Sequence, residues 1–303
     1  MNPNTPKYSL TNLDKIYWPQ DGYTKGDLIN YYEIIAPTIL PYLKNRPMVL
    51  NRHPNGIDHG NFFQKQVDLI HLPSWVETAR VKHKERSVDY LLVQNLETLL
   101  YVANLGCIEL NPFNSRINSL DNPDYMIIDL DPEDLTISSV IEVALVINNI
   151  LNNINIKNYC KSSGKRGLHI FVPLGAHVDF AQSQELCKMI GMLAELRLPK
   201  LVSLEHRPAK RQKRVYVDYL RNSRHQTTAS VYCVRPAPHA PVSAPLGWEE
   251  VRAGFDPADL NIETMPQRIR DIGDIFSPVL GPGLDLSTSL KALQELWAHE
   301  LKL

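Results

Sequence analysis

The sequence predicts an α+β fold in which mixed or antiparallel sheets are flanked by helices. Apolar residues recur at helical spacing over residues 26–43 and about 180–197. Short apolar runs typical of buried strands occupy residues 48–51, 125–131 and 168–174. Tight glycine-containing turns join some of these strands, which favours hairpins over a strictly parallel sheet.

The first elements follow from local signals in chain order. The helix over residues 26–43 is expected to end near Pro41, because proline cannot donate the next main-chain hydrogen bond. The strand at 48–51 leads into RHPNGIDHGNFF, a turn-rich loop. Residues 88–104 mix helix and strand signals, so their class stays open.

From residue 124 the pattern becomes sharper. A helix is expected to begin near Ser138, with Ser139 and Glu142 at the spacing of a capping box. A later helix, over about 180–197, ends at Pro199. The other expected elements are a strand, turn and strand within KNYCKSSGKRGLHIFVPL and two strands at 201–206 and 215–220.

Composition indicates a soluble intracellular protein with a sizeable core. The chain has 303 residues, 44% hydrophobic and 21% charged, and its net charge of −1 means that any nucleic-acid-binding surface is local. Its four cysteines form no CxxC pair, which is typical of reduced thiols and argues against zinc. No signal peptide pattern opens the chain, and no apolar run approaches the ~18 residues of a membrane span. We therefore expect a cytoplasmic protein.

The chain is expected to form one domain over residues 1–303. It contains no internal repeat and no low-complexity segment. The proline-rich residues 236–246 are interpreted as an extended segment that wraps the body of the protein. A small separate domain after this segment stays open on size alone.

The stretch DYMIIDLDPE contains two carboxylates at the end of an apolar strand. Side chains alternate along a strand, so Asp129 and Asp131 share a face and their Cα atoms lie roughly 6.6 Å apart. Two negative charges at this distance repel unless they are protonated, solvated or bridged by cations. The pattern therefore indicates a candidate metal site.

A third carboxylate, Asp218, falls in the apolar run VYVDYL. An aspartate in mid-strand is costly unless it is paired or bound to a cation. Its surroundings are basic, with seven Lys or Arg residues between Arg207 and Arg224. Two interpretations stay open: a salt bridge in a solvated basic hairpin, or a metal site whose neighbouring arginines receive phosphates.

The turn SSGKRGLHIFVP is a candidate phosphate-binding segment. Ser163 and two glycines allow close approach of main-chain amides, and Lys165 and Arg166 add positive charge. His169 lies in the following strand, where a core role and a functional role are equally open. The segment is not a P-loop, because the GxxxxGK[ST] spacing is absent.

Three aspartates with phosphate-binding basic residues are typical of two-metal phosphoryl or nucleotidyl transfer. Polymerisation and hydrolysis can both use such a site. A phosphatase of the haloacid dehalogenase type also carries a DxD strand end, but Pro132 and Glu133 fit that pattern badly.

Two N-terminal features bear on the ligand. Asn12, Lys15 and Lys25 are candidates for binding one anion, although their spacing alone favours ordinary surface positions. Phe62 and Phe63 lie in a polar stretch, where they either stack on unpaired bases or anchor the loop.

Taken together, the segments IDLDP, SSGKRGLHIFVP and VYVDYLRN resemble the polymerase domain of bacterial DNA ligase D, within the archaeo-eukaryotic primase superfamily. Similar segments extend from LTNLDKIYWPQDGYTKGDLINYY through FFQK and LGCIELNPF to SVYCVRPAPHAPVSAPLGWEEV. The resemblance implies a primase-like catalytic core with RRM-like βα units. It also implies a DNA-end and template-binding portion (1–120), a catalytic core (121–235) and a C-terminal wrapping segment with a helix (236–303).

The resemblance implies a template-dependent nucleotidyltransferase that uses two Mn²⁺ or Mg²⁺ ions and NTP or dNTP substrates in non-homologous end joining. Its partners would be DNA with gaps, 3′ overhangs or 5′-phosphorylated ends, the end-binding protein Ku and a DNA ligase activity, with nucleoid association during repair. The catalytic and metal-binding residues would be Asp129, Asp131 and Asp218. The nucleotide would be contacted by Ser163, Arg166, His169, Arg211, Arg221 and Arg235. The DNA would be contacted by Asn12, Lys15, Lys25, Arg52, Phe62 and Phe63.

Three positions depart from the family pattern. Asn111 stands where relatives usually have histidine, and an amide cannot replace an imidazole as a metal ligand or proton carrier. Arg166 stands at the usual lysine of the turn, and Lys213 replaces a glycine before the third strand. A primase that starts chains without a primer and a non-catalytic module that bridges DNA ends remain alternatives to the polymerase.

Overall fold

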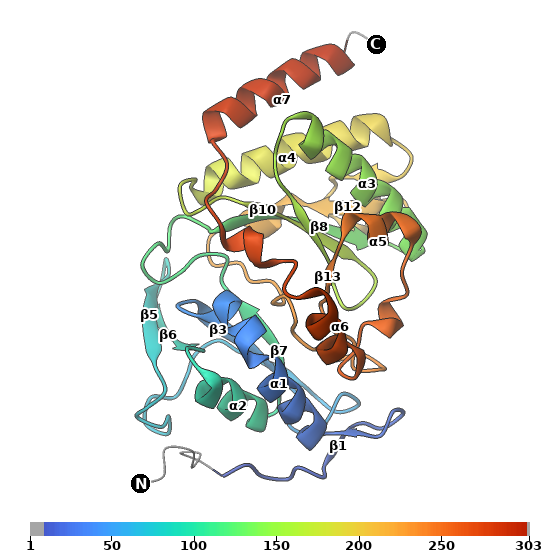
Figure 1. Cartoon of the computed structure of the whole chain (residues 1–303). Coiled ribbons are helices and arrows are strands. Elements are labelled where there is room, and N and C mark those ends of the chain that lie inside the picture. The colour runs from blue at the N-terminus through green and yellow to red at the C-terminus, as the bar shows by residue number, and fades with distance from the viewer. Residues whose placement is uncertain (1–8, 302–303) are drawn as a thin grey trace. The chain divides into compact units, whose positions relative to one another are not determined.

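Two compact units make up residues 9–301, the range that this computed structural model describes (Figure 1). Unit 1 consists of the residues up to Asn118 together with Thr227–Ala244 and Pro257–Asp274. Unit 2 consists of Ser119–Gln226, Pro245–Asp256 and the residues from Ile275 onward. The sequence predicts no signal peptide at the N-terminus. Residues 1–8 of this N-terminal segment lie outside the described range.

Unit 1 is built on an antiparallel sheet with the order β4-β3-β6-β5, in which β7 also pairs with β3. A separate two-stranded sheet joins β1 and β2. The strands are β1 (Ile16–Trp18), β2 (Tyr23–Thr24), β3 (Pro47–Arg52), β4 (Phe62–Gln64), β5 (Thr78–Lys82), β6 (Ser87–Leu92) and β7 (Cys107–Pro112). The helices are α1 (Lys25–Leu43), α2 (Leu96–Asn104), η3 (Pro257–Asp259) and α6 (Thr264–Ile272).

Helix α1 confirms the predicted helix and begins at a capping box. Thr24 Oγ1 accepts from Asp27 N at 3.1 Å, and Thr24 N donates to Asp27 Oδ2 at 2.7 Å. The helix continues past Pro37 and Pro41 to Leu43. Each proline lacks one main-chain donor, but the buried apolar face of the helix outweighs this loss.

Unit 2 is built on a six-stranded mixed sheet with the order β11-β12-β8-β10-β9-β13, in which only β11 and β12 are parallel. Its strands are β8 (Tyr125–Pro132), β9 (Tyr159–Ser162), β10 (Leu168–Pro173), β11 (Val202–Ser203), β12 (Val215–Asp218) and β13 (Pro245–Leu246). Its helices are α3 (Ile137–Asn153), α4 (Phe180–Arg197), η1 (Pro208–Lys210), η2 (Tyr219–Asn222), α5 (Trp248–Ala253), η4 (Ser277–Leu280) and α7 (Leu286–Glu300). The mixed sheets and flanking helices confirm the predicted α+β class.

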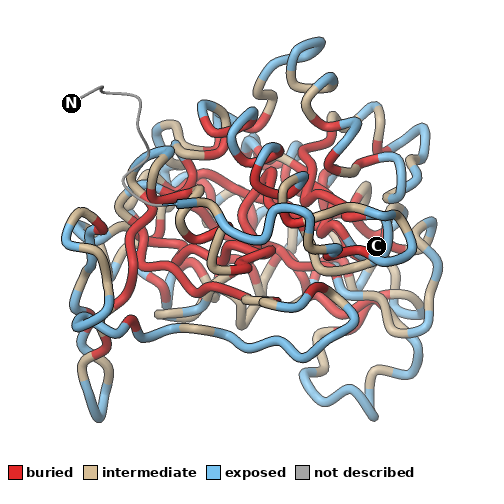
Figure 2. Tube along the Cα trace, turned by 90° about the horizontal axis from the view of Figure 1, so that it is seen from below, coloured by how far each residue is buried: buried red, intermediate tan, exposed pale blue. Residues whose placement is uncertain are grey.

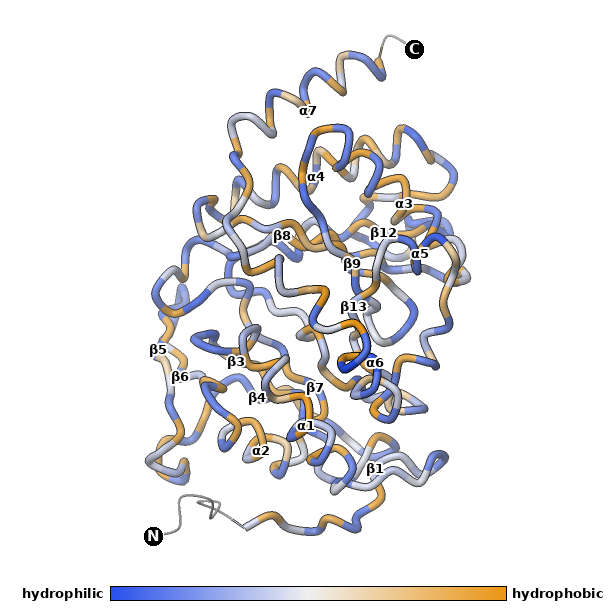
Figure 3. Tube along the Cα trace, in the orientation of Figure 1, coloured by the Kyte–Doolittle hydropathy of each residue, from blue (hydrophilic) through white to orange (hydrophobic). Residues whose placement is uncertain are grey.

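One face of the unit 2 sheet is apolar and lies under α3 and α4 (Figure 1). On β8 this face carries Ile128 and Leu130, which are fully buried, and their neighbours Leu168 and Ile170 on β10 extend it. Figure 3 shows hydrophobic residues concentrated along β8, α3 and α4, and Figure 2 shows the exposed residues mainly on loops and outer turns. The opposite face of the same strands is therefore where polar side chains are placed.

Segments from late in the chain are held into unit 1 by specific hydrogen bonds. Trp18 Nε1 donates to Ala237 O at 2.9 Å, and Tyr31 Oη donates to Tyr232 O at 2.8 Å. In unit 2, β13 pairs with β9 and Arg197 Nε donates to Glu300 Oε1 at 3.1 Å.

Several predicted elements differ in detail. The predicted capping box at Ser139 and Glu142 is wrong, because α3 begins earlier, at Ile137. Thr136 is the residue before the helix, and its side chain makes no capping hydrogen bond. The strand predicted over 201–206 is limited to β11. After it, Glu205 N donates to Ser203 Oγ at 3.1 Å, so the main chain turns instead of continuing as a strand. The stretch 88–104, whose class the sequence left open, contains nearly all of β6 followed by α2.

All four cysteines are buried free thiols. Within residues 9–301, the helices are too short or too polar to cross a membrane.

Gly167 occupies a position where a side chain would clash with β8. A Cβ there would lie 2.4 Å from Leu130 O, which is main chain and cannot move aside alone. We expect Gly167→Ala to destabilise the protein by about 1–3 kcal/mol, as overpacking does elsewhere. Urea unfolding measures this, and Gly60→Ala, whose Cβ would meet nothing within 4 Å, serves as the matched control. Equal stability of the two variants would contradict the close approach of turn and strand.

Candidate active site

The register of three strands brings the predicted catalytic residues of unit 2 together. Asp129 of β8 lies opposite Asp218 of β12 on one side and opposite His169 of β10 on the other. Directly opposed residues in an antiparallel pair share a face of the sheet. Asp131, two residues along β8 and opposite Tyr216, lies on this face too. The sheet therefore gathers three carboxylates and an imidazole on its polar face.

The sequence predicted that Asp218 lies in the middle of a strand, and this is wrong. Asp218 is the last residue of β12 and caps the helical turn η2. Its Oδ1 accepts from Leu220 N at 3.1 Å and from Tyr216 Oη at 3.2 Å. The apolar run VYVDYL looked like one strand because the half-buried Tyr219 and Leu220, which begin the helical turn, are as hydrophobic as strand residues. The cap fixes the direction of the carboxylate.

Arg221 of η2 neutralises part of the carboxylate cluster. Its Nε donates to Asp129 Oδ2 at 3.1 Å, and its Nη2 lies 3.4 Å from Asp218 Oδ2. On the other side, His169 Nε2 lies 3.2 Å from Asp129 Oδ1. The buried carboxylate of Asp129 is thus held between a guanidinium and an imidazole.

The two aspartates of the DLD segment differ electrostatically. Burial alone would raise the pKa of Asp129, but His169, Arg221 and Lys161 outweigh burial and hold it below its usual value. For Asp131, displacement of surrounding water and the charge of Asp129 raise the pKa to about 6, although its side chain remains exposed. Asp129 is therefore ionised at neutral pH, whereas Asp131 titrates at a pH just below neutral.

The donor set suits hard divalent cations, which prefer carboxylate oxygens. Asp129 Oδ1 is buried without a hydrogen bond of good geometry, so it is an oxygen that a cation can satisfy. In the described part of the chain, however, no group of three His, Cys, Asp or Glu side chains is already arranged around one metal position. The Arg221 guanidinium instead contacts both Asp129 and Asp218.

The predicted phosphate-binding turn follows β9 and is shaped by two serine hydroxyls. Ser163 Oγ accepts from Gly167 N at 3.0 Å and from Lys165 N at 3.2 Å, while Ser162 Oγ accepts from Gly164 N at 2.9 Å. Lys165 and the predicted Arg166 are both exposed. Ser163 therefore shapes the turn from inside, and the charges are presented outside.

Arg211 is brought to the same end of the strands as Asp131. Its guanidinium stacks on the ring of Tyr216 at 3.8 Å from the centroid and donates to Glu205 O at 3.1 Å. Tyr216 lies opposite Asp131. The nearby Lys213 has a φ of 55°, in the left-handed region that glycine adopts more readily than lysine.

Lys161 was missed by the sequence reasoning. It lies on β9 directly opposite His169, is fully buried, and its Nζ is 5.6 Å from the centroid of the Phe171 ring. It therefore extends the row of charged residues across four strands of the sheet. Only the pairing of β9 with β10 shows that Lys161 lies beside His169, and this pairing cannot be read from the sequence.

In unit 1, the three predicted anion-binding residues do lie together. Lys15 N donates to Asn12 O at 3.1 Å, and Lys25 N donates to Lys15 O at 2.8 Å. The Lys25 side chain is buried and its Nζ donates to Thr11 O at 2.7 Å. Burial, and then the charge of Lys15, lower the pKa of Lys25. A buried ammonium bonded to a neutral carbonyl is suited to receive an anion.

The predicted DNA contacts Arg52, Phe62 and Phe63 lie on β3 and β4. The two phenylalanines were expected in a loop, but they belong to β4, paired with β3. Both stay exposed, at 46% and 57%. Arg52 donates to Leu105 O at 2.9 Å and lies over the Phe62 ring at 5.0 Å. The strand therefore presents aromatic side chains to solvent beside a cation.

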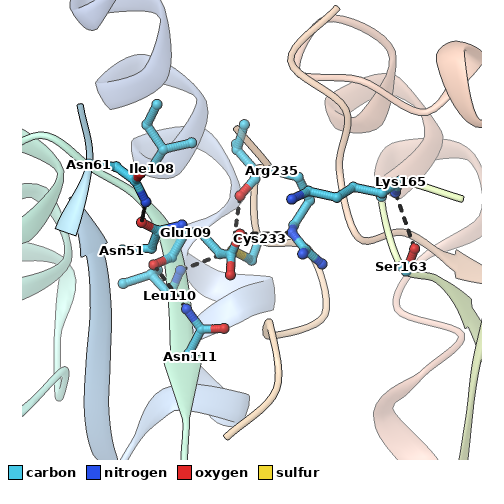
Figure 4. Close-up of polar contacts among 12 residues, drawn as sticks. Asn51, Asn61, Ile108, Glu109, Leu110, Asn111, Ser163, Lys165, Cys233 and Arg235 are labelled. Atoms are coloured by element: carbon cyan, nitrogen blue, oxygen red, sulfur yellow. Dashed lines mark hydrogen bonds and ion pairs between the residues drawn. The ribbon is translucent and has the colours of Figure 1, made fainter. Parts of the chain in front are cut away.

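Arg235, predicted to bind nucleotide, also belongs to unit 1. Its Nε donates to Glu109 Oε2 at 3.0 Å (Figure 4). Asn111, for which the resemblance implied a histidine, is buried on the same strand, and its Nδ2 lies 3.5 Å from Glu109 O. Glu109 was not singled out from the sequence.

Comparisons with known proteins give consistent results. Residues 24–276 match the family model described as "LigD, primase-polymerase domain". The multifunctional non-homologous end joining protein LigD of Mycolicibacterium smegmatis is 30% identical over 273 residues, which cover 89% of this chain and 36% of that protein. The bifunctional LigD of Bacillus subtilis is 29% identical over 278 residues, covering 90% and 44%. The chain thus spans less than half the length of these curated relatives.

A solved structure agrees with these matches. The polymerase domain of Mycobacterium tuberculosis ligase D in complex with DNA superimposes with a TM-score of 0.84 at 28% identity, covering 92% of this chain and all of that one. The primase-like fold implied by the sequence motifs is confirmed.

The raised pKa of Asp131 predicts a pH-dependent effect on stability. A carboxyl group with a folded-state pKa of about 6 binds its proton more tightly when folded, so its ionisation removes stability as the pH rises from about 4 to 6. In chelator, Asp131→Asn should raise Tm at pH 7.5 and leave it unchanged near pH 4.

The expected gain is about 1 kcal/mol, reduced by solvent screening of the exposed side chain. Thermal unfolding at the two pH values measures it, with the exposed Asp58→Asn as control. A gain at pH 4 equal to that at pH 7.5 would contradict the shift.

Proposed function

Because the chain belongs to the LigD primase-polymerase domain family, a family of DNA/RNA nucleotidyltransferases, we propose that it adds nucleotides to primer 3′ ends under the direction of a template. In this role it fills gaps and ends during non-homologous end joining. The observation that carries the proposal is the placement of Asp129, Asp131 and Asp218 on one face of the unit 2 sheet.

In the proposed reaction the primer 3′ oxygen attacks the α-phosphorus of a nucleoside triphosphate, and pyrophosphate leaves. Asp129 and Asp131 would hold both divalent ions, Mn²⁺ or Mg²⁺, and Asp218 one of them. These ions activate the attacking oxygen and stabilise the leaving one. Asp129 is suited to this because it is ionised at neutral pH, whereas Asp131 gains its full charge only above about pH 6.

The basic residues of unit 2 are proposed to bind the triphosphate of NTP or dNTP. Arg221 pairs with both Asp129 and Asp218. If a cation were bound by these carboxylates, the guanidinium would be released from them and could pair with phosphate. Arg211 is held by stacking near Asp131, and its planar fork suits phosphate. The other proposed nucleotide contacts are Ser163, Arg166, His169 and Arg235.

Unit 1 is proposed to bind the DNA. Asn12, Lys15 and Lys25 would hold a 5′-phosphate, while Phe62 and Phe63 would stack on template bases beside Arg52. DNA with gaps, 3′ overhangs or 5′-phosphorylated ends is the expected substrate, with Ku and a ligase activity as partners. The protein would act in the cytoplasm on the nucleoid. Residues 1–120, 121–235 and 236–303 remain the proposed functional portions of one polymerase domain.

Extension of a primer opposite a short gap with a 5′-phosphate tests the proposal. Both rNTPs and dNTPs should be tried, each with manganese and with magnesium. Templated addition supports a polymerase, and synthesis on a single-stranded template without primer would favour the primase alternative. Tight gap binding without any addition would instead favour an end-bridging module in which Asn111 accompanies lost activity.

Loss of one carboxylate should remove addition selectively. We expect Asp129→Asn and Asp218→Asn to lower the rate by at least about 100-fold, the scale on which single electrostatic contacts to a transition state act. Binding to gapped DNA should change little. The control is Asp134→Asn, an exposed aspartate just beyond β8 with a φ of 53° that asparagine tolerates. Full activity in Asp129→Asn would remove the basis of the assignment.

The proposed 5′-phosphate site predicts a selective binding defect. Wild type should bind gapped DNA with a 5′-phosphate about tenfold more tightly than the same DNA with a 5′-hydroxyl, since bonds to charged groups contribute about 1.5–3 kcal/mol. Lys25→Met keeps the buried stem and should abolish that preference. Lys44→Met, exposed at the other end of α1, is the matched control. Equal wild-type affinity for both DNAs would count against the site.

A further inference from the structure

Tyr216 of unit 2 lies beside two of the clustered aspartates. It precedes Asp218 by two residues on β12, so both side chains lie on the same face of the sheet. Its Oη donates to Asp218 Oδ1 at 3.2 Å, and the strand register sets Tyr216 opposite Asp131 of β8. Only 2% of the residue is exposed. A buried phenol hydroxyl is thus directed at one of the proposed metal-binding carboxylates.

The ring that carries this hydroxyl is restrained by Arg211. The guanidinium lies 3.8 Å from the ring centroid, which is a close cation–π contact. Arg211 Nε donates to Glu205 O at 3.1 Å, and its Nη2 donates to His206 O at 2.9 Å. Because both acceptors are main-chain oxygens, the guanidinium is itself held in place and restricts the motion of the ring.

The two oxygens of the Asp218 carboxylate have different partners. Oδ1 accepts two hydrogen bonds, from Tyr216 Oη and from Leu220 N at 3.1 Å. Oδ2 instead lies 3.4 Å from Arg221 Nη2, and the same guanidinium donates through Nε to Asp129 Oδ2 at 3.1 Å. Oδ2 therefore faces the group that Asp218 shares with Asp129, while Oδ1 is bonded to donors of its own segment.

We propose that Tyr216 is a positioning residue, which orients the Asp218 carboxylate so that Oδ2 is presented to a divalent cation. The proposal rests on the proposed function, because that function supplies the cation. A hydrogen bond to Oδ1 restricts rotation of the carboxylate about its Cβ–Cγ bond and does not compete for Oδ2. Partners of this kind orient metal-ligating carboxylates and tune their affinity for the metal.

Arg221 cannot hold Asp218 in the same way when a cation is bound. Its contact is with Oδ2, the oxygen that the cation would need, and two positive charges repel each other. The bonds to Oδ1 do not depend on the partner of Oδ2. Their donors come from different elements, Tyr216 from β12 and Leu220 from η2, so together they restrict the carboxylate more than the amide does alone.

The hydroxyl also has an opposing effect, because a donor draws negative charge from the carboxylate and weakens its attraction for a cation. A neutral hydroxyl withdraws only a fraction of that charge, whereas a carboxylate that rotates away presents no oxygen to the ion. Orientation therefore outweighs charge withdrawal. Loss of the hydroxyl should weaken cation binding by about tenfold, the lower end of the effects that such outer partners have.

Tyr216→Phe tests the proposal, because it removes the hydroxyl and keeps the ring under Arg211. Electron paramagnetic resonance on the full chain should show Mn²⁺ binding about tenfold weaker than in wild type. In primer extension, the Mn²⁺ concentration for half the maximal rate should rise by the same factor, and excess Mn²⁺ should restore most of the rate. A damaged fold would not be rescued by the ion.

Two further variants separate orientation from stability. Tyr232 is also buried, and its Oη donates to Asp274 Oδ1 at 2.7 Å in unit 1. Tyr232→Phe therefore loses the same kind of bond and should lower Tm without changing Mn²⁺ affinity. Tyr216→Phe combined with Asp218→Asn should bind Mn²⁺ no more weakly than Asp218→Asn alone, because Tyr216 acts only through Asp218.

Crystal structures without metal show the orientation directly. Asp218 Oδ1 should face Tyr216 in a single orientation in wild type, and the carboxylate should rotate or adopt several orientations in Tyr216→Phe. An unchanged carboxylate in that variant, unchanged or tighter Mn²⁺ binding, or a further loss in the double variant would overturn the proposal.

Failure of the proposed function would look different. A wild type that binds Mn²⁺ but adds no nucleotide would contradict the polymerase, while the Mn²⁺ affinities would still decide the role of Tyr216. A wild type that binds no Mn²⁺ would overturn both.

Discussion

The pairing of β8 with β10 and β12 is the constraint on which the site depends. This register sets Asp129 between His169 and Asp218. The carboxylates of Asp129 and Asp218 therefore lie on neighbouring strands, directly opposite each other. Such an arrangement is stable only when opposite charges accompany it. Arg221 supplies that compensation through its contacts with Asp129 and Asp218. A sheet that gathers carboxylates thus also requires cations, whether from the chain or from solution.

The rest of unit 2 serves this register. Helices α3 and α4 cover the apolar face of the strands, so a slip of one residue would bury Asp129 among aliphatic side chains and move Ile128 or Leu130 to the polar face. Gly167 lets the turn between β9 and β10 approach the main chain of Leu130. The features that stabilise the sheet and the residues proposed to bind ligand therefore lie on the same strands.

The sequence predicted much of this because its signals are local. The apolar run before Asp129, the glycine turn after Ser163 and the helical stripe of α1 each depend on nearby residues, and each was found. The primase-like fold and the family were found through several separated motifs in the right order. The helix start at Thr136 and the strand end at Asp218 were missed, because hydrophobicity does not mark where a main chain stops pairing.

Long-range partners were harder to predict. Lys161 and Glu109 escaped notice because each depends on a residue on another segment, His169 for the first and Arg235 for the second. The grouping of Asn12, Lys15 and Lys25 was anticipated only as a possibility, and hydrogen bonds around the start of α1 bring it about. Residue type and spacing therefore identified the chemistry, while strand register decided which side chains meet.

Binding of Mn²⁺ tests the central claim most directly, because it asks whether the gathered carboxylates form a metal site. Electron paramagnetic resonance can count ions bound to the full chain with a non-hydrolysable nucleoside triphosphate. The account predicts saturable binding of two ions in wild type and loss of that binding in Asp129→Asn. Wild type that binds no Mn²⁺, or Asp129→Asn that binds it equally well, would contradict the account.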